Sequence, residues 1–215
     1  MNDKYRPNNF PPVVKSIIFI NVAVWIIQLV MDRQGFGLTE MLGLYPVTSP
    51  AFRPYQVLTH MFTHADYNPN GSIILYHILF NMFTLWMFGR ILENIWGPKR
   101  FLNFYLLCGI GAAAAHLLVQ YITKNESMAI GASGAIMGVA VAFAYLFPNT
   151  PLYIMFIPIP IKAKWVMIAF IAYDFFVGVA SVGGDNVAHF AHLGGAITGF
   201  IIVLIWNKTD RRKFY

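Results

Sequence analysis

The segment Gly-Ala-Ser-Gly, residues 131–134, places a hydroxyl group on a small, uncharged and apolar stretch of the chain. A serine hydroxyl becomes an effective nucleophile when a base removes its proton, and imidazole has the pKa that suits this work near neutral pH. Two histidines in a later apolar stretch, His189 and His192, are candidate bases. Ser133 and one of these histidines would together form a pair able to carry out acyl transfer.

Acyl transfer also needs hydrogen-bond donors at the point where the carbonyl oxygen becomes negative. In the segment His-Ile-Leu-Phe-Asn, His77 and Asn81 are four residues apart, so a helix places both side chains on one face. They offer an imidazole N–H and an amide NH₂, and the backbone N–H of Ser133 would add a third donor. Gly131, just before the serine, would allow close backbone approach or a local departure from helix geometry.

A carboxylate that orients the histidine, as in a Ser-His-Asp triad, has no good candidate in the sequence. Asp174 lies near the middle of one expected membrane span, and Glu93 lies toward the inner end of another. We therefore expect a Ser-His dyad.

The composition indicates the environment that must hold these residues. Of the 215 residues, 58% are hydrophobic and 11% are charged, and the mean hydropathy is +0.58, which is far outside soluble proportions. We therefore expect an integral membrane protein in contact with a lipid bilayer. The formal net charge of +6 comes from basic residues that flank apolar runs, so the membrane surface, not nucleic acid, is the expected partner of that charge.

Apolar runs close to the roughly 20 residues that cross a bilayer core as a helix occur six times. The sequence thus predicts an all-α, polytopic bundle of six transmembrane helices within residues 13–207, with tails at residues 1–12 and 208–215. A proline-rich piece, residues 151–162, is expected to be a loop at the interface. The six expected spans are residues 13–31, 72–95, 101–123, 129–147, 164–182 and 187–207.

The basic residues predict how these spans are oriented. Most Lys and Arg residues fall at the two termini and at the connections on the same side, whereas Arg33, Arg53 and Lys124 fall on the other side. By the positive-inside rule, both termini are expected to be cytoplasmic, in a cell inner or plasma membrane. The long connection of residues 32–71 is then expected outside.

The second, fourth and sixth spans all begin at the outer face in this topology. At a rise of about 1.5 Å per residue, five polar residues fall about one to two helical turns below that face: His77, Asn81, Ser133, His189 and His192. Polar side chains in apolar helices usually face the bundle interior, because lipid offers them no hydrogen-bond partner. Three separate segments therefore converge on one layer.

Glycine pairs would let the helices that carry Ser133 and His192 approach a partner closely. Gly134 with Gly138 and Gly195 with Gly199 each form a GxxxG pattern, which is typical of tightly packed membrane helices. The serine and a histidine would then come within hydrogen-bond reach. Each motif alone also has a structural interpretation, because serine packs well between membrane helices and an HxxxN pair can hold a bundle together.

Taken together, these motifs resemble those of the rhomboid intramembrane serine proteases. GASG around Ser133 resembles the GxSG nucleophile motif of that family, and AHLGGAITG at residues 191–199 resembles its AHxxG motif. Residues 77–97, which hold the HxxxN pair and Glu93, resemble the second span of the family. The likeness covers about residues 50–200 in the expected order.

The resemblance implies a role for each residue. Ser133 would be the nucleophile and His192 the general base, while His77, Asn81 and the Ser133 amide would stabilise the oxyanion. His192 is preferred to His189 because only His192 has glycines three and seven residues later. The supporting glycines would be Gly131, Gly134, Gly195 and Gly199.

The resemblance also implies the function. The chain would be an intramembrane endopeptidase that hydrolyses a peptide bond in or near the transmembrane segment of a membrane-protein substrate. Such substrates, which would arrive laterally from the bilayer, would be its partners. Water would enter through a depression from the outer face, near which the polar layer lies. The sequence indicates no metal or other cofactor, and it does not determine the oligomeric state.

Three alternatives fit parts of the sequence. A catalytically inactive rhomboid-like protein that binds transmembrane helices would usually lack the serine or the histidine, and this chain has both. A metal-dependent hydrolase would use His60 with His64 or His189 with His192, but no HExxH motif occurs and acidic co-ligands at the same depth are lacking. A transporter would more often show charged or broken helices at the midplane, where Asp174 is the sole prominent acidic residue.

Overall fold

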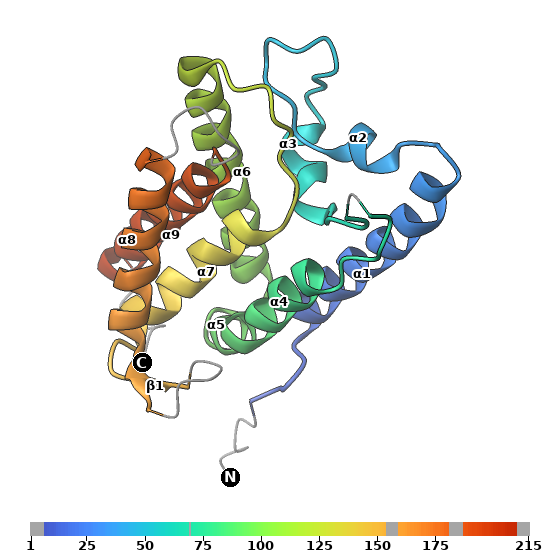
Figure 1. Ribbon diagram of the computed structural model, residues 1–215. Coiled ribbons are helices and arrows are strands. Elements are labelled where there is room, and N and C mark those ends of the chain that lie inside the picture. The colour runs from blue at the N-terminus through green and yellow to red at the C-terminus, as the bar shows by residue number, and fades with distance from the viewer. Residues whose placement is uncertain (1–6, 69, 154–158, 181–186, 210–215) are drawn as a thin grey trace.

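The structure is a computed structural model, and it describes residues 7–68, 70–153, 159–180 and 187–209. The described chain is mainly helical (Figure 1). Its elements are α1 (Pro12–Arg33), α2 (Leu38–Leu42), α3 (Gln56–Thr59), η1 (His60–Phe62), α4 (Tyr76–Thr84), η2 (Leu85–Gly89), α5 (Arg90–Trp96), α6 (Pro98–Thr123), α7 (Ser133–Leu146), β1 (Pro151–Leu152), β2 (Ile161–Lys162), α8 (Ala163–Ala180) and α9 (Val187–Thr209).

The helices agree with a protein that crosses the membrane several times. Among the described residues, 4 helices are long and apolar enough to span a bilayer, namely α1, α6, α8 and most of α9. The second predicted span is one unbroken helical run made of α4, η2 and α5, in which η2 is a π-helical turn. The fourth predicted span contains α7. The number of six crossings stays a prediction, as do the tails at residues 1–12 and 208–215, of which residues 1–6 and 210–215 lie outside the described chain.

Helix α7 is shorter than the predicted span of residues 129–147. Its 14 residues rise about 21 Å, which is less than the roughly 30 Å of a bilayer core. The helix begins only at Ser133 because Gly131, with φ of +119°, has a backbone conformation that a helix does not allow. Ahead of it, Ala129 pairs with Leu44 through two backbone hydrogen bonds of 2.8 and 2.9 Å, so this stretch is extended.

Helix α7 is the centre of the molecule. Every residue from Gly134 to Ala144 is buried, as expected for a helix that is apolar on all sides. In Figure 1, α7 runs between the pair α4 and α5 on one side and α8 and α9 on the other. The main packing partners of α7 are α9 and α6, which also pack against each other.

The two predicted glycine pairs face each other across α7 and α9. A Cβ atom added to Gly199 would lie 2.7 Å from the Cα of Gly138, and one added to Gly138 would lie 2.9 Å from the carbonyl oxygen of Gly195. A Cβ atom on Gly195 would collide with the carbonyl oxygen of Gly134. The expectation of close helix approach is confirmed, because any side chain at these positions would push the helices apart.

Glu93 fixes the start of α1 against the rest of the bundle. Its two carboxylate oxygens accept the backbone N–H groups of Val13 and Val14 at 2.8 and 2.7 Å. These groups belong to the first turn of α1, where backbone N–H donors have no partner inside the helix and a negative charge is favourable. Glu93 therefore joins the start of α1 to α5.

The connection of residues 34–75 is folded against the bundle. The side chain of Gln28, on α1, donates to the hydroxyl of Thr39 at 2.6 Å and to the carbonyl oxygen of His64 at 3.0 Å. The proline-rich piece after α7 ends in a two-residue antiparallel pairing of β1 with β2, and residues 154–158 between them lie outside the described chain. At the other end of α7, the backbone N–H of Gly131 donates to the carbonyl oxygen of His60 at 2.9 Å, which joins the first connection to the residues just before Ser133.

Candidate active site

The side chains of Ser133 and His192 meet between α7 and α9. Nε2 of His192 lies 2.8 Å from Oγ of Ser133, which is the distance of a hydrogen bond in which the hydroxyl donates. The close glycine contacts between α7 and α9 make this approach possible, since Gly134 and Gly195 belong to the same two helices. The pair has the geometry of a nucleophile beside its base.

The start of α7 supplies donors next to the hydroxyl. Ser133 is the first residue of the helix, and the first intrahelical bond on this side runs from the N–H of Ile136 to the carbonyl of Ala132 at 3.0 Å. The N–H groups ahead of Ile136 therefore have no partner inside the helix, and they carry the partial positive charge of a helix N-terminus. An anion that forms at Ser133 would meet this charge.

The imidazole of His77 places a ring nitrogen close to Gly131 and Ser133, at the start of α7. The backbone N–H of Ala65 donates to Nδ1 of His77 at 3.1 Å, so the proton of the neutral ring is on Nε2. A Cβ atom added to Gly131 would lie 3.1 Å from this Nε2 and 3.8 Å from the Ser133 hydroxyl oxygen. The Nε2–H of His77 and the hydroxyl of Ser133 thus both lie close to Gly131, where there is no side chain between them and the backbone.

Asn81 is oriented differently from the expectation. Its amide nitrogen donates to the carbonyl oxygen of His77 at 2.8 Å, within its own helix, and the residue is buried. The contact is the local side chain-to-backbone bond that holds polar residues in apolar helices. Of the three expected oxyanion donors, the structure brings His77 and the Ser133 amide to the site, while Asn81 bonds to its own helix.

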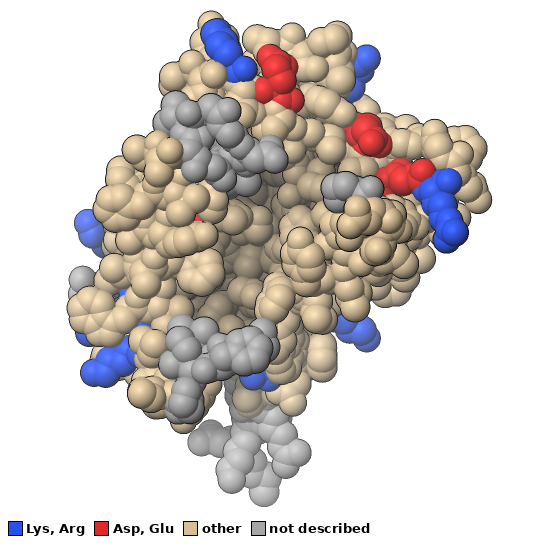
Figure 2. All heavy atoms as spheres, viewed as in Figure 1, with Lys and Arg blue, Asp and Glu red and all other residues tan. Residues whose placement is uncertain are grey.

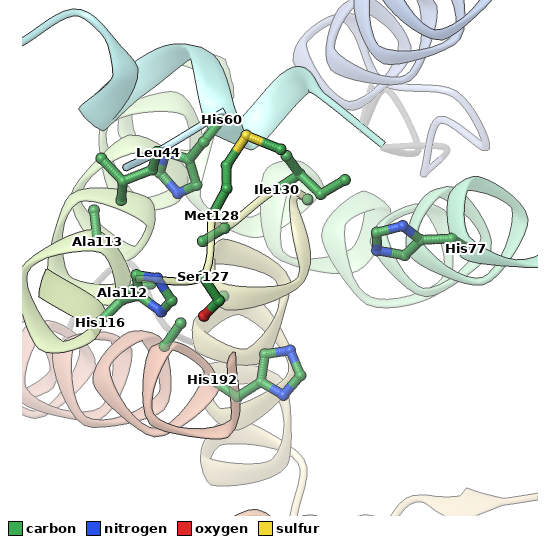
Figure 3. A pocket seen from close by; sticks show the side chains of 14 residues that line it. Leu44, His60, His77, Ala112, Ala113, His116, Ser127, Met128, Ile130 and His192 are labelled. Carbon is green, nitrogen blue, oxygen red and sulfur yellow. The ribbon is translucent and has the colours of Figure 1, made fainter. Parts of the chain in front are cut away.

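A cavity of about 310 Å³ lies beside the pair. Four histidines from four different elements line it: His60 from η1, His77 from α4, His116 from α6 and His192 from α9 (Figure 3). A water molecule takes about 30 Å³ in the liquid, so this volume holds several. His60 and His116 were missed as lining residues, although His116 lies near the outer end of its span and the depth argument used for His77 applies to it.

Two histidines of the first connection stay neutral. Burial, together with the smaller effect of the neighbouring His77, lowers the pKa of His64 to about 3. The rings of His64 and His77 have their centroids 5.1 Å apart. Burial also lowers the pKa of His60, although its Nδ1 donates to the carbonyl oxygen of Gln56 at 2.9 Å. Neither imidazole therefore adds a positive charge to the site near neutral pH.

A carboxylate does lie beside His192, so the expectation that none is available was wrong. Nδ1 of His192 is 3.3 Å from both carboxylate oxygens of Asp174, and Nδ1 of His189 is 2.6 Å from Oδ1. Helices α8 and α9 are consecutive and packed together, and Asp174 and His192 stand about equally far from the connection between them. The error came from treating Asp174 as a midplane residue, when its antiparallel neighbour is His192.

The cluster of Asp174, His189 and His192 could also be considered as a metal site, as in the alternative of a metal-dependent hydrolase. Ligand atoms of Asp174, His189 and His192 lie within 4.8 Å of one another, so the argument that no acidic co-ligand is available at this depth was also wrong. Tetrahedral zinc bonds of about 2.0–2.1 Å hold ligand atoms about 3.3 Å apart. The 2.6 Å between His189 and Asp174 is instead a hydrogen-bond distance, and we interpret the group as a hydrogen-bonded network.

Comparison with known proteins adds an independent finding. A family model described as the Rhomboid domain matches residues 51–208. The chain is 33% identical over 205 residues to the presenilin-associated rhomboid-like protein, mitochondrial, of Homo sapiens, which covers 92% of this chain and 50% of that protein. It is 28% identical over 204 residues to Rhomboid protein 1, mitochondrial, of Saccharomyces cerevisiae, a match that covers 92% of this chain and 53% of that protein. It is 26% identical over 216 residues to RHOMBOID-like protein 12, mitochondrial, of Arabidopsis thaliana, a match that covers 94% of this chain and 60% of that protein. The chain thus spans about half the length of the curated relatives it matches.

Proposed function

The chain belongs to the rhomboid family, and we propose that it is an intramembrane serine endopeptidase, which cleaves a peptide bond in or near the transmembrane segment of another membrane protein. The observation that carries the proposal is the 2.8 Å contact between Oγ of Ser133 and Nε2 of His192 beside a cavity that can hold water. It joins residues 59 positions apart in the sequence.

The reaction follows from the positions of these groups. His192 takes the proton of Ser133 through Nε2 as the serine oxygen bonds to the substrate carbonyl carbon. The oxyanion that forms is stabilised by the Ser133 backbone N–H and by Nε2–H of His77. His192 then gives its proton to the leaving amine, which breaks the peptide bond and leaves an acyl-enzyme.

Water completes the cycle. A water molecule from the cavity gives a proton to His192 and attacks the acyl carbon, and the proton returns to Ser133 as the new carboxylic acid leaves. The short helix α7 supports this step, because its missing outer turns leave the space that the cavity fills. We propose six membrane crossings, with both ends of the chain on the side rich in Lys and Arg and the cavity near the other face.

The substrate would enter from the side of the molecule. Figure 2 shows a furrow between the surface over α8 and the surface over α4, lined mainly by uncharged residues. Large apolar side chains are exposed on both elements, including Leu79 and Phe80 on α4 and Phe170 and Phe176 on α8. A transmembrane helix that packs against either element would therefore meet exposed apolar side chains. A peptide bond must leave its helical hydrogen bonding before attack, so small or helix-weakening residues near the substrate's outer end would favour cleavage.

Two cellular membranes are candidates for the location of the chain. The basic residues favour a cell inner or plasma membrane with cytoplasmic termini. The names of the relatives place those proteins in mitochondria, which favours a mitochondrial membrane. Fractionation of the source cells, followed by protease protection of a tag on each terminus, decides between them.

Cleavage of a model substrate in liposomes tests the proposal. We expect the parent protein to cleave a single-span substrate with small residues near its outer end, and the Ser133→Ala and His192→Ala variants to lose cleavage. If both variants cleave normally, the assignment is wrong. If the parent binds the substrate and does not cleave it, the chain is a helix-binding relative without activity. Chelators should leave cleavage intact, and inhibition by them would favour the metal alternative.

A further inference from the structure

The side chains of Asp174 and His189 extend the Ser133–His192 pair into a hydrogen-bonded chain of four residues. We propose that Asp174 is a positioning residue, which holds His192 in the tautomer whose Nε2 is free to take the serine proton, and that His189 anchors its carboxylate. The inference rests on the proposed function and adds the component that the dyad lacks: a group that fixes the base.

The bonding around Asp174 sets the position of each proton. A carboxylate only accepts hydrogen bonds, so the imidazole nitrogens that face it must carry protons. Nδ1 of His192 lies 3.3 Å from both carboxylate oxygens of Asp174. With its proton on Nδ1, the neutral ring of His192 has a bare Nε2, and this is the atom 2.8 Å from the Ser133 hydroxyl. The arrangement thus selects the form of His192 that acts as a base.

Burial makes this carboxylate dependent on its partners. The side chain of Asp174 is 3% exposed, on a mainly apolar helix whose other charged residue, Lys164, lies in the first turn. A carboxylate withdrawn from water is unfavourable unless donors compensate for the lost hydration. Nδ1 of His189 makes the shorter contact with the carboxylate, at 2.6 Å, and Nδ1 of His192 makes the longer one, at 3.3 Å. Asp174 is therefore held in place by His189 while it faces His192.

The position of His189 is itself fixed by its neighbours. Its ring stands nearly perpendicular to the ring of Tyr173, with centroids 5.9 Å apart. On the other side, a Cβ atom added to Gly178 would be 3.4 Å from the Cβ of His189, so α8 and α9 approach closely here because position 178 has no side chain. His189 thus has a role as an anchor, which the sequence motif around His192 did not indicate.

The contact between Asp174 and His192 is expected to strengthen during the reaction. When His192 takes the serine proton, its ring becomes positive, and the nearby carboxylate stabilises that charge. Catalytic hydrogen bonds are often long before substrate binds and tighten in the transition state. Without the carboxylate, the other tautomer of His192 becomes available and the imidazolium has no counter-charge. By comparison with triad hydrolases, we expect a loss of about 10²- to 10⁴-fold in kcat.

The kinetic test compares Asp174→Asn with a matched change elsewhere. Glu93→Gln makes the same chemical substitution at a residue 2% exposed, in the same bundle, without contact to His192. In liposomes, we expect Asp174→Asn to lower kcat by about 10²-fold or more with little change in KM, and Glu93→Gln to keep kcat within a few-fold of the parent. Asp174→Glu, which retains the carboxylate, should recover part of the loss. His189→Gln should have a smaller effect than Asp174→Asn.

A spectroscopic test is independent of activity. The chain has 6 histidines, and ¹⁵N-histidine labelling in a Ser133→Ala background, with His192→Gln to assign the signal, reports which ring nitrogen of His192 carries the proton. We expect Nδ1 to be protonated when Asp174 is present and the preference to be lost in Asp174→Asn. The same tautomer in both proteins, together with unchanged kcat in Asp174→Asn, would overturn the inference. Failure of the parent to cleave would instead refute the proposed function, and the tautomer measurement would still decide the role of Asp174.

Discussion

Gly199 on α9 lies so close to Gly138 on α7 that a Cβ atom at position 199 would stand 2.7 Å from the Gly138 Cα. His192 lies seven residues before Gly199 on α9, and Ser133 lies five residues before Gly138 on α7. The separation of these helices therefore sets the distance between the hydroxyl and the imidazole.

Gly199→Ala should reduce cleavage strongly while the chain still folds and inserts. The added methyl group has no space and must separate α7 from α9, which lengthens the 2.8 Å contact between Ser133 and His192. Displacement of a reacting group by about 1 Å costs on the order of 10² in rate. Ile197→Ala, on the exposed face of the same helix, is the control and should cleave like the parent. Equal rates for the two variants would argue against control of the site by the glycine contact.

Gly131→Ala should lower kcat by more than backbone strain explains. At φ of +119° an alanine is strained, and its Cβ would also lie 3.1 Å from Nε2 of His77, the expected oxyanion donor. Gly35→Ala provides the matched control, because Gly35 has φ of +83° and nothing within 4 Å of an added Cβ. We expect both variants to lose some thermal stability and only Gly131→Ala to lose activity. Comparable kcat values in the two proteins would exclude a role for the open backbone at position 131.

His77→Ala should have a larger effect than Asn81→Ala. Loss of one oxyanion donor lowers kcat by about 10²–10³, and the protonated Nε2 of His77 lies beside Gly131 and Ser133. The amide of Asn81 bonds to the backbone of its own helix, so its removal should mainly soften α4. Steady-state kinetics of both variants on one substrate measure the order, and a larger loss for Asn81→Ala would reverse the assignment.

The first connection, residues 34–75, should lose stability in acid because of His64. Its pKa in the folded protein is about 3, against about 6.5 in an unfolded chain. The unfolded state therefore binds more protons between these values, so this contribution to stability is complete above about pH 6.5 and declines as the pH falls toward 3. Thermal unfolding at pH 7.5 and pH 5 should show a smaller difference for His64→Gln than for the parent. An identical pH dependence in both would contradict the buried neutral state.

The pairing of Ser133 with His192 was predictable because it depends on features that are visible in the sequence. Apolar runs give the spans, basic residues give their direction, and counting along antiparallel helices gives the depth of each polar residue. The glycine patterns indicated which helices pack closely, and the structure bears this out for Gly134, Gly138, Gly195 and Gly199. The family assignment followed from the order of the same motifs and agrees with the match to residues 51–208.

Other parts of the site could not be predicted in this way. Hydropathy does not detect the change of backbone conformation at Gly131, so the predicted fourth span began too early. The orientation of His77 is set by a backbone N–H of Ala65, and a backbone group has no sequence signature. Asp174 was placed near the middle of its expected span, whereas in the structure its carboxylate lies 3.3 Å from Nδ1 of His192.

The most direct test of the central claim is to locate a covalent adduct of a fluorophosphonate, a reagent that reacts with activated serine hydroxyls. The protein in liposomes is treated with the reagent, and mass spectrometry of its peptides identifies and times the modification. We expect a single fast adduct on Ser133, which forms at a far lower rate in His192→Ala. An adduct on a different residue, or labelling of Ser133 at the same rate in His192→Ala, would contradict the central claim.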